Sequence, residues 1–172
     1  MSVNEFDWEG FRALVGRLDT LLTGELSDPE TFAEDCRRTL AFLYTAGVSM
    51  PSAGDVFEEA GGDSFWERAM ASDAGALDPV ATEERITELA EKIGFSVDAL
   101  QPDEVDEDAD EEMLLAASNL WEVRVSLATG GIHYDAERLR EAAWEWSFGF
   151  DDWGGQALLA LTGLHDVLWG VR

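Results

Sequence analysis

A seam of apolar residues near the C-terminus limits the possible folds most strongly, because it repeats every three or four positions over roughly 30 residues. This spacing puts about one residue per turn on a single helical face, so it predicts helix rather than strand. The seam crosses Gly154 and Gly155, and each glycine costs about 1 kcal/mol inside a helix relative to alanine. We therefore expect either one helix kinked at this pair or two helices that meet there. The seam comprises Leu139, Ala143, Trp146, Phe150, Trp153, Ala157, Leu161, Leu164 and Leu168.

Similar stripes predict helices along most of the chain. Gly24 and Gly94 end two of them, and Asp28 followed by Pro29 is typical of a helix start. No window alternates with period two among β-branched residues, and no Asn-Gly or Asp-Gly hairpin signal occurs. The chain of 172 residues is therefore expected to be one all-α domain over residues 1–172, a bundle of about five to seven helices. The predicted helices are residues 11–22, 29–46, 54–60, 64–71, 79–93, 113–129 (closed by the glycines at 130 and 131) and a last region from about 135.

An acidic stretch interrupts these patterns, with eight acids among the twelve residues 101–112. Mutual repulsion favours an extended, mobile loop there. Asp106, Asp108 and Asp110 have the spacing that begins a calcium-binding EF-hand loop. Glu111 then stands where the sharp turn needs glycine, and Ala117 stands where the loop needs a bidentate glutamate. We expect a solvated connector rather than a calcium site.

The charge balance restricts the classes of partner. The chain has 37 acidic and 11 basic residues, a formal net charge of −26, and Lys92 is its one lysine. Phosphate backbones and anionic membranes are held by lysine and arginine, so direct nucleic-acid binding and membrane binding are disfavoured. Acids spread along the whole chain indicate halophilic adaptation. A regulator that imitates nucleic acid and occupies a basic protein is the alternative.

The sequence also indicates a cellular compartment. The N-terminal residues MSVNEFDWEG lack the basic start and apolar run of a signal peptide. No uncharged stretch reaches the ~20 apolar residues that a membrane span requires. The single cysteine, Cys36, cannot form an internal disulfide. These features predict a cytoplasmic protein.

Patterns for catalysis, metals and cofactors fail. Cys36, His133 and His165 lack zinc-ligand spacing, neither histidine has a glutamate three residues before it, and no strand precedes Gly62-Asp63-Ser64 to make that serine a nucleophile. Glycine-rich phosphate loops are absent as well. Cys36 lies on an apolar stripe and is expected in the core. We predict no metal, no cofactor and no enzymatic activity.

The segment 144–153 is the candidate binding region, because it holds five aromatic residues in ten positions. Trp144 and Phe148 lie on a different helical face from Trp146, Phe150 and Trp153, so one face can be core while the other covers a partner. His165 is expected to be a partly buried, hydrogen-bonded structural residue. The predicted binding residues are Trp144, Trp146, Phe150, Asp152, Trp153 and His165.

The C-terminal third resembles a bacterial family of domains of unknown function, number 5063 among such domains. The family has a helix, a Gly and Tyr turn, a Trp-rich helix, a Trp-Gly step and an Ala-Leu-x-x-Leu-His ending. The resemblance implies an all-helical bacterial domain and assigns no activity. Relatives commonly have histidines where this chain has Asp152 and Gln156, which argues against a histidine-dependent role here. The matching residues are Gly130, Tyr134, Trp146, Phe150, Trp153, Gly154, Ala157, Leu158, Leu161 and His165.

The function predicted from these features is a non-enzymatic helical adaptor that contacts another protein through the Trp-rich region. A regulator of a basic protein stays open as the second reading. The third is a small-molecule or metal-binding enzyme that uses a carboxylate pair such as Glu145 with Asp152, whose seven-residue spacing puts both on one face of a continuous helix.

Overall fold

The apolar stripes of the sequence become the inward faces of long helices. The computed structural model describes residues 5–24, 29–60, 84–93 and 107–169, and within them every regular element is helical and none is a strand. These helices pack as one bundle, so the predicted all-α fold is confirmed. The elements are α1 (Trp8–Thr23), α2 (Pro29–Val48), α3 (Ala53–Ala60), α6 (Glu107–Asp135), α7 (Leu139–Phe148) and α8 (Phe150–Trp169), with a further helical segment at residues 84–93.

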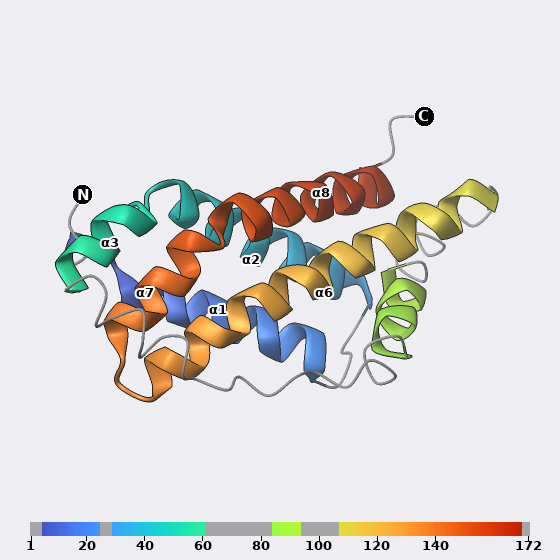
Figure 1. Ribbon diagram of the computed structural model, residues 1–172. Helices are drawn as coiled ribbons and strands as arrows, with labels where there is room; N and C mark the ends of the chain where they lie inside the picture. The colour runs from blue at the N-terminus through green and yellow to red at the C-terminus, as the bar shows by residue number, and fades with distance from the viewer. Residues whose placement is uncertain (1–4, 25–28, 61–83, 94–106, 170–172) are drawn as a thin grey trace.

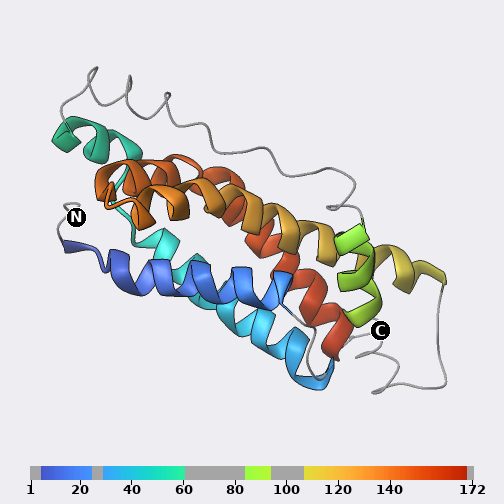
Figure 2. The same cartoon turned by 90° about the horizontal axis from the view of Figure 1, so that it is seen from below.

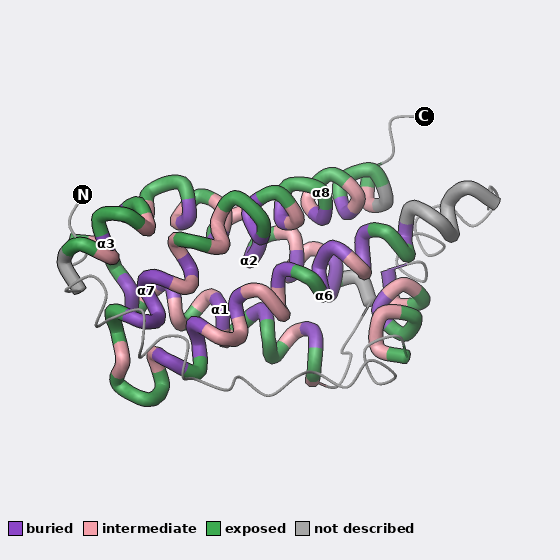
Figure 3. Tube along the Cα trace, in the orientation of Figure 1, coloured by how far each residue is buried: buried purple, intermediate pink, exposed green. Residues whose placement is uncertain are grey.

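Four long helices form a closed ring. Helix α1 packs against α2, α2 against α8, α8 against α6, and α6 against α1. Arg12 of α1 pairs with Asp135, and Asp19, further along α1, pairs with Arg124, further back in α6. These two helices therefore run antiparallel, and Figures 1 and 2 show the same alternation for the other three pairs. Where burial is described, the inward faces of these four helices are buried (Figure 3).

Short elements cover the two ends of the ring. Helices α3 and α7 pack together at one end, and residues 84–93 lie toward the other (Figure 1). There, Arg85 Nε donates to the Leu22 carbonyl at 2.6 Å, and Nη2 donates to the Gly24 carbonyl at 2.7 Å. Carbonyls at the end of a helix have no partner within it. Arg85 therefore supplies donors to two carbonyls at the C-terminal end of α1 and connects residues 84–93 to that helix.

Several predicted boundaries are confirmed. Helix α1 ends at Gly24, whose amide donates to the Thr20 carbonyl, and α2 begins at Pro29. Helix α3 covers the first predicted short helix, and Leu89 and Ile93 are fully buried on the inner face of their segment. The second short helix at 64–71 lies outside the described residues, as do the Asp28 cap, the Gly62-Asp63-Ser64 motif and the cap at 78–79.

The prediction of an extended loop over residues 101–112 is wrong for residues 107–112. Helix α6 begins at Glu107, so residues 107–112 are helical, while residues 101–106 lie outside the described part of the chain. Carboxylates at the N-terminal end of a helix interact favourably with its dipole, which opposes their mutual repulsion. A continuous helix from Glu107 also places Asp108 and Asp110 in a geometry different from an EF-hand loop.

The predicted helix end at the glycines 130 and 131 is wrong, and of the two alternatives left open at Gly154 and Gly155 the structure has the single helix. Helix α6 continues through residues 130 and 131 to Asp135, and α8 continues through residues 154 and 155. The C-terminal seam is instead divided at Gly149, between α7 and α8. Tertiary packing explains the continuity, because Gly130 and Gly154 leave room for aromatic rings rather than ending a helix.

Candidate functional site

The aromatic segment 144–153 closes the α7 end of the bundle from inside. Trp146 and Trp153 are completely buried. The Trp146 ring stacks on Trp8 at a centroid distance of 6.0 Å and meets the edge of Phe11 at 5.0 Å. Trp8 and Phe11 belong to α1, at the opposite end of the sequence. Two of the predicted binding residues, Trp146 and Trp153, are therefore core residues that no partner can contact in the folded chain.

Hydrogen bonds fix both buried indoles. Trp146 Nε1 donates to the Leu127 carbonyl at 3.0 Å, and Trp153 Nε1 donates to the Trp146 carbonyl at 2.9 Å. The first contact depends on Gly130, because a Cβ at that position would lie 2.6 Å from Cε2 of Trp146. An indole N–H that is buried without a partner costs about 1–3 kcal/mol. The glycine thus lets a tryptophan of α7 reach the backbone of α6.

The other aromatic residues lie nearer the surface. Trp144 is 8% exposed and stacks on Phe148, which is 63% exposed, with ring centroids 4.8 Å apart and an angle of 11° between the rings. Phe150 is half-buried, and its ring lies close enough to Gly154 that a Cβ there would be 2.7 Å from Cε2. The aromatic residues therefore do not divide cleanly into a core face and an exposed face, because Trp144 is buried, Phe150 is half-buried and Phe148 is exposed.

The two predicted polar binding residues are both exposed on α8. Asp152 lies in its first turn, and the ring of His165 lies 5.3 Å from that of Trp169. The expectation that His165 is partly buried is therefore wrong. The seven-residue argument for a Glu145–Asp152 pair also fails, because the chain leaves the helix at Gly149, between these residues.

His133 of α6 is buried beside Glu145 of α7, a position that its sequence context did not predict. His133 is buried, and its Nε2 lies 3.9 Å from Oε1 of Glu145, beyond hydrogen-bond distance. Burial lowers the pKa of His133, the charge of Arg138 lowers it further, and Glu141 acts in the opposite direction. Burial raises the pKa of Glu145. Both pKa shifts favour the neutral form of the group. The apolar periodicity of the sequence could not predict this pair, because His133 and Glu145 lie in different helices that are joined by a turn.

The described residues include potential metal ligands and the thiol of Cys36. Within the described ranges, no three His, Cys, Asp or Glu side chains are grouped so that they could hold a metal ion. Cys36 is fully buried in the core, as predicted, and burial raises its pKa to about 12. A thiol with so high a pKa is a weak nucleophile at neutral pH.

The outer face of α8 keeps an apolar stripe exposed. Leu158, Leu159 and Trp169 are 44%, 57% and 49% exposed. Gly155 lies on the same side, one turn before Leu158 and Leu159, and a Cβ added there would meet no atom within 4 Å. The guanidinium carbon of Arg37, from α2, lies 4.9 Å from the Trp169 ring centroid and supports that ring from one side.

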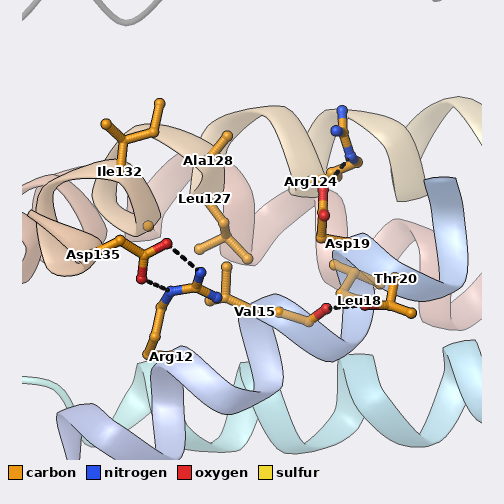
Figure 4. Close-up of a pocket in the computed structure, with 12 residues that line it drawn as sticks. Arg12, Val15, Leu18, Asp19, Thr20, Arg124, Leu127, Ala128, Ile132 and Asp135 are labelled. Atoms are coloured by element: carbon orange, nitrogen blue, oxygen red, sulfur yellow. Dashed lines mark hydrogen bonds and ion pairs between the residues drawn. The ribbon is translucent and has the colours of Figure 1, made fainter. Parts of the chain in front are cut away.

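A groove of about 370 Å³ lies between α1 and α6 (Figure 4). An arginine–aspartate pair crosses it at each end. Arg12 donates to both carboxylate oxygens of Asp135, at 2.9 and 2.6 Å, and Arg124 Nε donates to Asp19 at 2.8 Å. Apolar side chains from both helices form the walls between the pairs, among them Val15, Leu127, Ala128 and Ile132.

No protein-family model, curated protein or solved structure matches the chain. Among the described helices, none combines the length and hydropathy needed to cross a membrane.

Proposed function

We propose that this chain is a non-enzymatic binding module that contacts a protein partner through the outer face of α8. The observation that supports the proposal is the exposed stripe of Leu158, Leu159 and Trp169, with the open position at Gly155 beside it. Apolar residues gathered on one face of a soluble protein often mark an interaction site. An exposed glycine allows a second helix to approach α8 closely.

The charge around this stripe defines the partner. Asp151, Asp152 and Asp166 are exposed on α8, and the whole chain has a formal net charge of −26. Complementary charge accelerates association and suppresses partners of like charge. The partner that fits is an amphipathic helix with an apolar face and basic flanks, which places apolar residues on the stripe and cations beside the aspartates. A basic regulatory target belongs to the same class.

The role of the aromatic segment changes in this proposal. Trp146 and Trp153 hold α8 in place from the inside, whereas Asp152 and His165 lie on the exposed side of the helix. Four of the six predicted binding residues lie in α8, and two of these four, Asp152 and His165, are exposed to a partner. The family resemblance of the C-terminal third stays a prediction, and it assigns no activity that competes with a binding role.

A peptide titration tests the proposal. The probe is a helical peptide of about 18 residues with leucine on one face and lysine on the flanks, compared with a scrambled peptide of the same composition. Titrations in about 1 M salt screen non-specific attraction to the acidic chain, because the Debye length falls to ~3 Å. The variant is Leu159→Asp, and the matched control is Leu139→Asp, which changes an exposed leucine of α7.

The expected result is saturable binding of the amphipathic peptide with a Kd of about 1–100 μM, corresponding to about 5–8 kcal/mol. Leu159→Asp should weaken it at least tenfold, and Leu139→Asp should leave it within about twofold. Equal binding of the scrambled peptide, or equal weakening by the two substitutions, would show that charge alone causes association and would refute the proposed site.

A further inference from the structure

We infer that the groove between α1 and α6 binds small monocarboxylic acids that have an apolar tail. The groove is separate from the outer face of α8, and its lining residues all belong to α1 and α6. Its volume of about 370 Å³ lies at the lower end of the range of small-molecule sites, ~300–1,000 Å³. The ligand class follows from the hydrogen-bond donors, the charge and the walls of the groove.

Arg12 retains a donor for an anion. A guanidinium has five N–H groups. Arg12 donates to Asp135 through Nε and Nη2, and Arg124 donates to Asp19 through Nε. Nη1 of Arg12 has no hydrogen bond to Asp135 and lies beside Gly16 of the groove lining, because a Cβ built on that glycine would be 2.8 Å from it. The guanidinium of Arg124 instead lies against the Trp121 ring, 4.5 Å from its centroid, and its Nη1 is buried. A ligand carboxylate beside Nη1 of Arg12 would form charge-assisted hydrogen bonds.

The local charge sets the ligand's charge. The groove contains two arginines and two aspartates, so its formal charge is zero in a chain whose net charge is −26. It is therefore much less negative than the rest of the surface. A monoanion meets donors at modest electrostatic cost, whereas each further negative charge on a ligand is repelled by the surrounding acids.

The walls require an apolar tail. Ile132 is half exposed on the rim, and Ala128 and Leu127 line α6 between the two ion pairs. Gly16 keeps the groove open beside Arg12, because a Cβ there would lie 2.8 Å from Nη1 and displace the guanidinium. Burial of alkyl surface strengthens binding about fourfold per methylene group. A short alkyl chain beside a single carboxylate matches this combination.

The test is an NMR titration of the full chain with hexanoate. Acetate supplies the carboxylate without the tail, and hexan-1-ol supplies the tail without the carboxylate. The amides of Gly16 and Gly131 report on the groove, and that of Gly155 reports on the distant α8 face. We expect saturable shifts at Gly16 and Gly131 with a Kd of about 1 mM, and at least tenfold weaker binding of acetate and hexan-1-ol.

Two substitutions test whether hexanoate binds in the groove. Ala128→Phe fills the groove and should weaken hexanoate binding at least tenfold, while Ala13→Phe puts the same ring on an exposed position of α1 outside the lining and should leave the Kd within about twofold. If Ala128→Phe fails to fold, Arg12→Gln replaces it and should weaken hexanoate more than hexan-1-ol. Shifts that do not saturate, equal binding of hexan-1-ol, or unchanged affinity after filling the groove would overturn the inference.

Discussion

Replacing Gly130 with alanine tests how the bundle is locked together. In an ordinary helix interior, Gly→Ala is favourable by about 1 kcal/mol. Here the added Cβ would lie 2.6 Å from Cε2 of the buried Trp146 ring. The indole must move, at an overpacking cost of about 1–3 kcal/mol, and losing its 3.0 Å hydrogen bond to Leu127 costs about 1–3 kcal/mol more. The expected net loss, after the helix gain is subtracted, is about 1–5 kcal/mol, with a central value of about 3 kcal/mol.

The neighbouring glycine supplies the control. A Cβ at position 131 would make only an ordinary contact, 3.9 Å from Arg12 Nε, so Gly131→Ala should be neutral or should stabilise the chain by up to about 1 kcal/mol. Both variants are compared by thermal and urea denaturation followed by far-UV circular dichroism in the same salt. The central loss of about 3 kcal/mol corresponds to a Tm lower by roughly 6–12 °C for a chain of this size.

A double substitution separates the clash from a general effect at this position. Trp146→Phe removes Nε1 and shortens the ring, so Gly130→Ala should cost at least about 1 kcal/mol less in that background. If Gly130→Ala is as stable as the wild type, or if its cost is the same with and without Trp146→Phe, the reasoning about the α6–α7 contact is refuted.

Three further predictions follow from the same structure. Native Cys36 should react with a thiol reagent at pH 8 at least a hundredfold more slowly than in urea, because it is buried and its pKa is about 12; similar rates would contradict the core position. The pKa of His133 is lower in the folded chain than in the unfolded chain, so the unfolded chain takes up the proton first. Urea titrations should therefore show the free energy of unfolding falling as the pH drops below about 6.5, and His133→Gln should flatten that part of the profile. Finally, with a net charge of −26, stability should rise with added salt; a continued rise to molar salt distinguishes halophilic adaptation from screening, which is nearly complete by about 1 M.

The helical stripes could be predicted from the sequence because their cause is local. Phe11, Leu18 and Leu22 are spaced for one face of α1, and all three are buried. Two helix boundaries predicted from single residues were also correct: Gly24 follows the last residue of α1, and Pro29 is the first residue of α2. The end inferred at the glycines 130 and 131 was wrong, because the role of Gly130 depends on Trp146, which reaches it from another helix.

The candidate sites were less predictable than the fold. Nothing in the spacing of Arg12 and Asp135, or of Asp19 and Arg124, indicates that these residues bound one groove, since they are more than a hundred positions apart in the chain. The aromatic segment was recognised, but its sequence could not show that Trp146 faces Trp8 rather than a partner.

Residue types and spacings of three or four positions were enough to establish the helical class, the apolar face of most helices and the acidic character of the chain, because each of these is a local property. Packing between helices settled which glycines are contact points, which tryptophans are core, and where arginines meet aspartates. Those outcomes depend on antiparallel packing that brings α1 against α6 and against the tryptophans of α7 and α8, more than a hundred positions later in the sequence, and no local pattern encodes that arrangement.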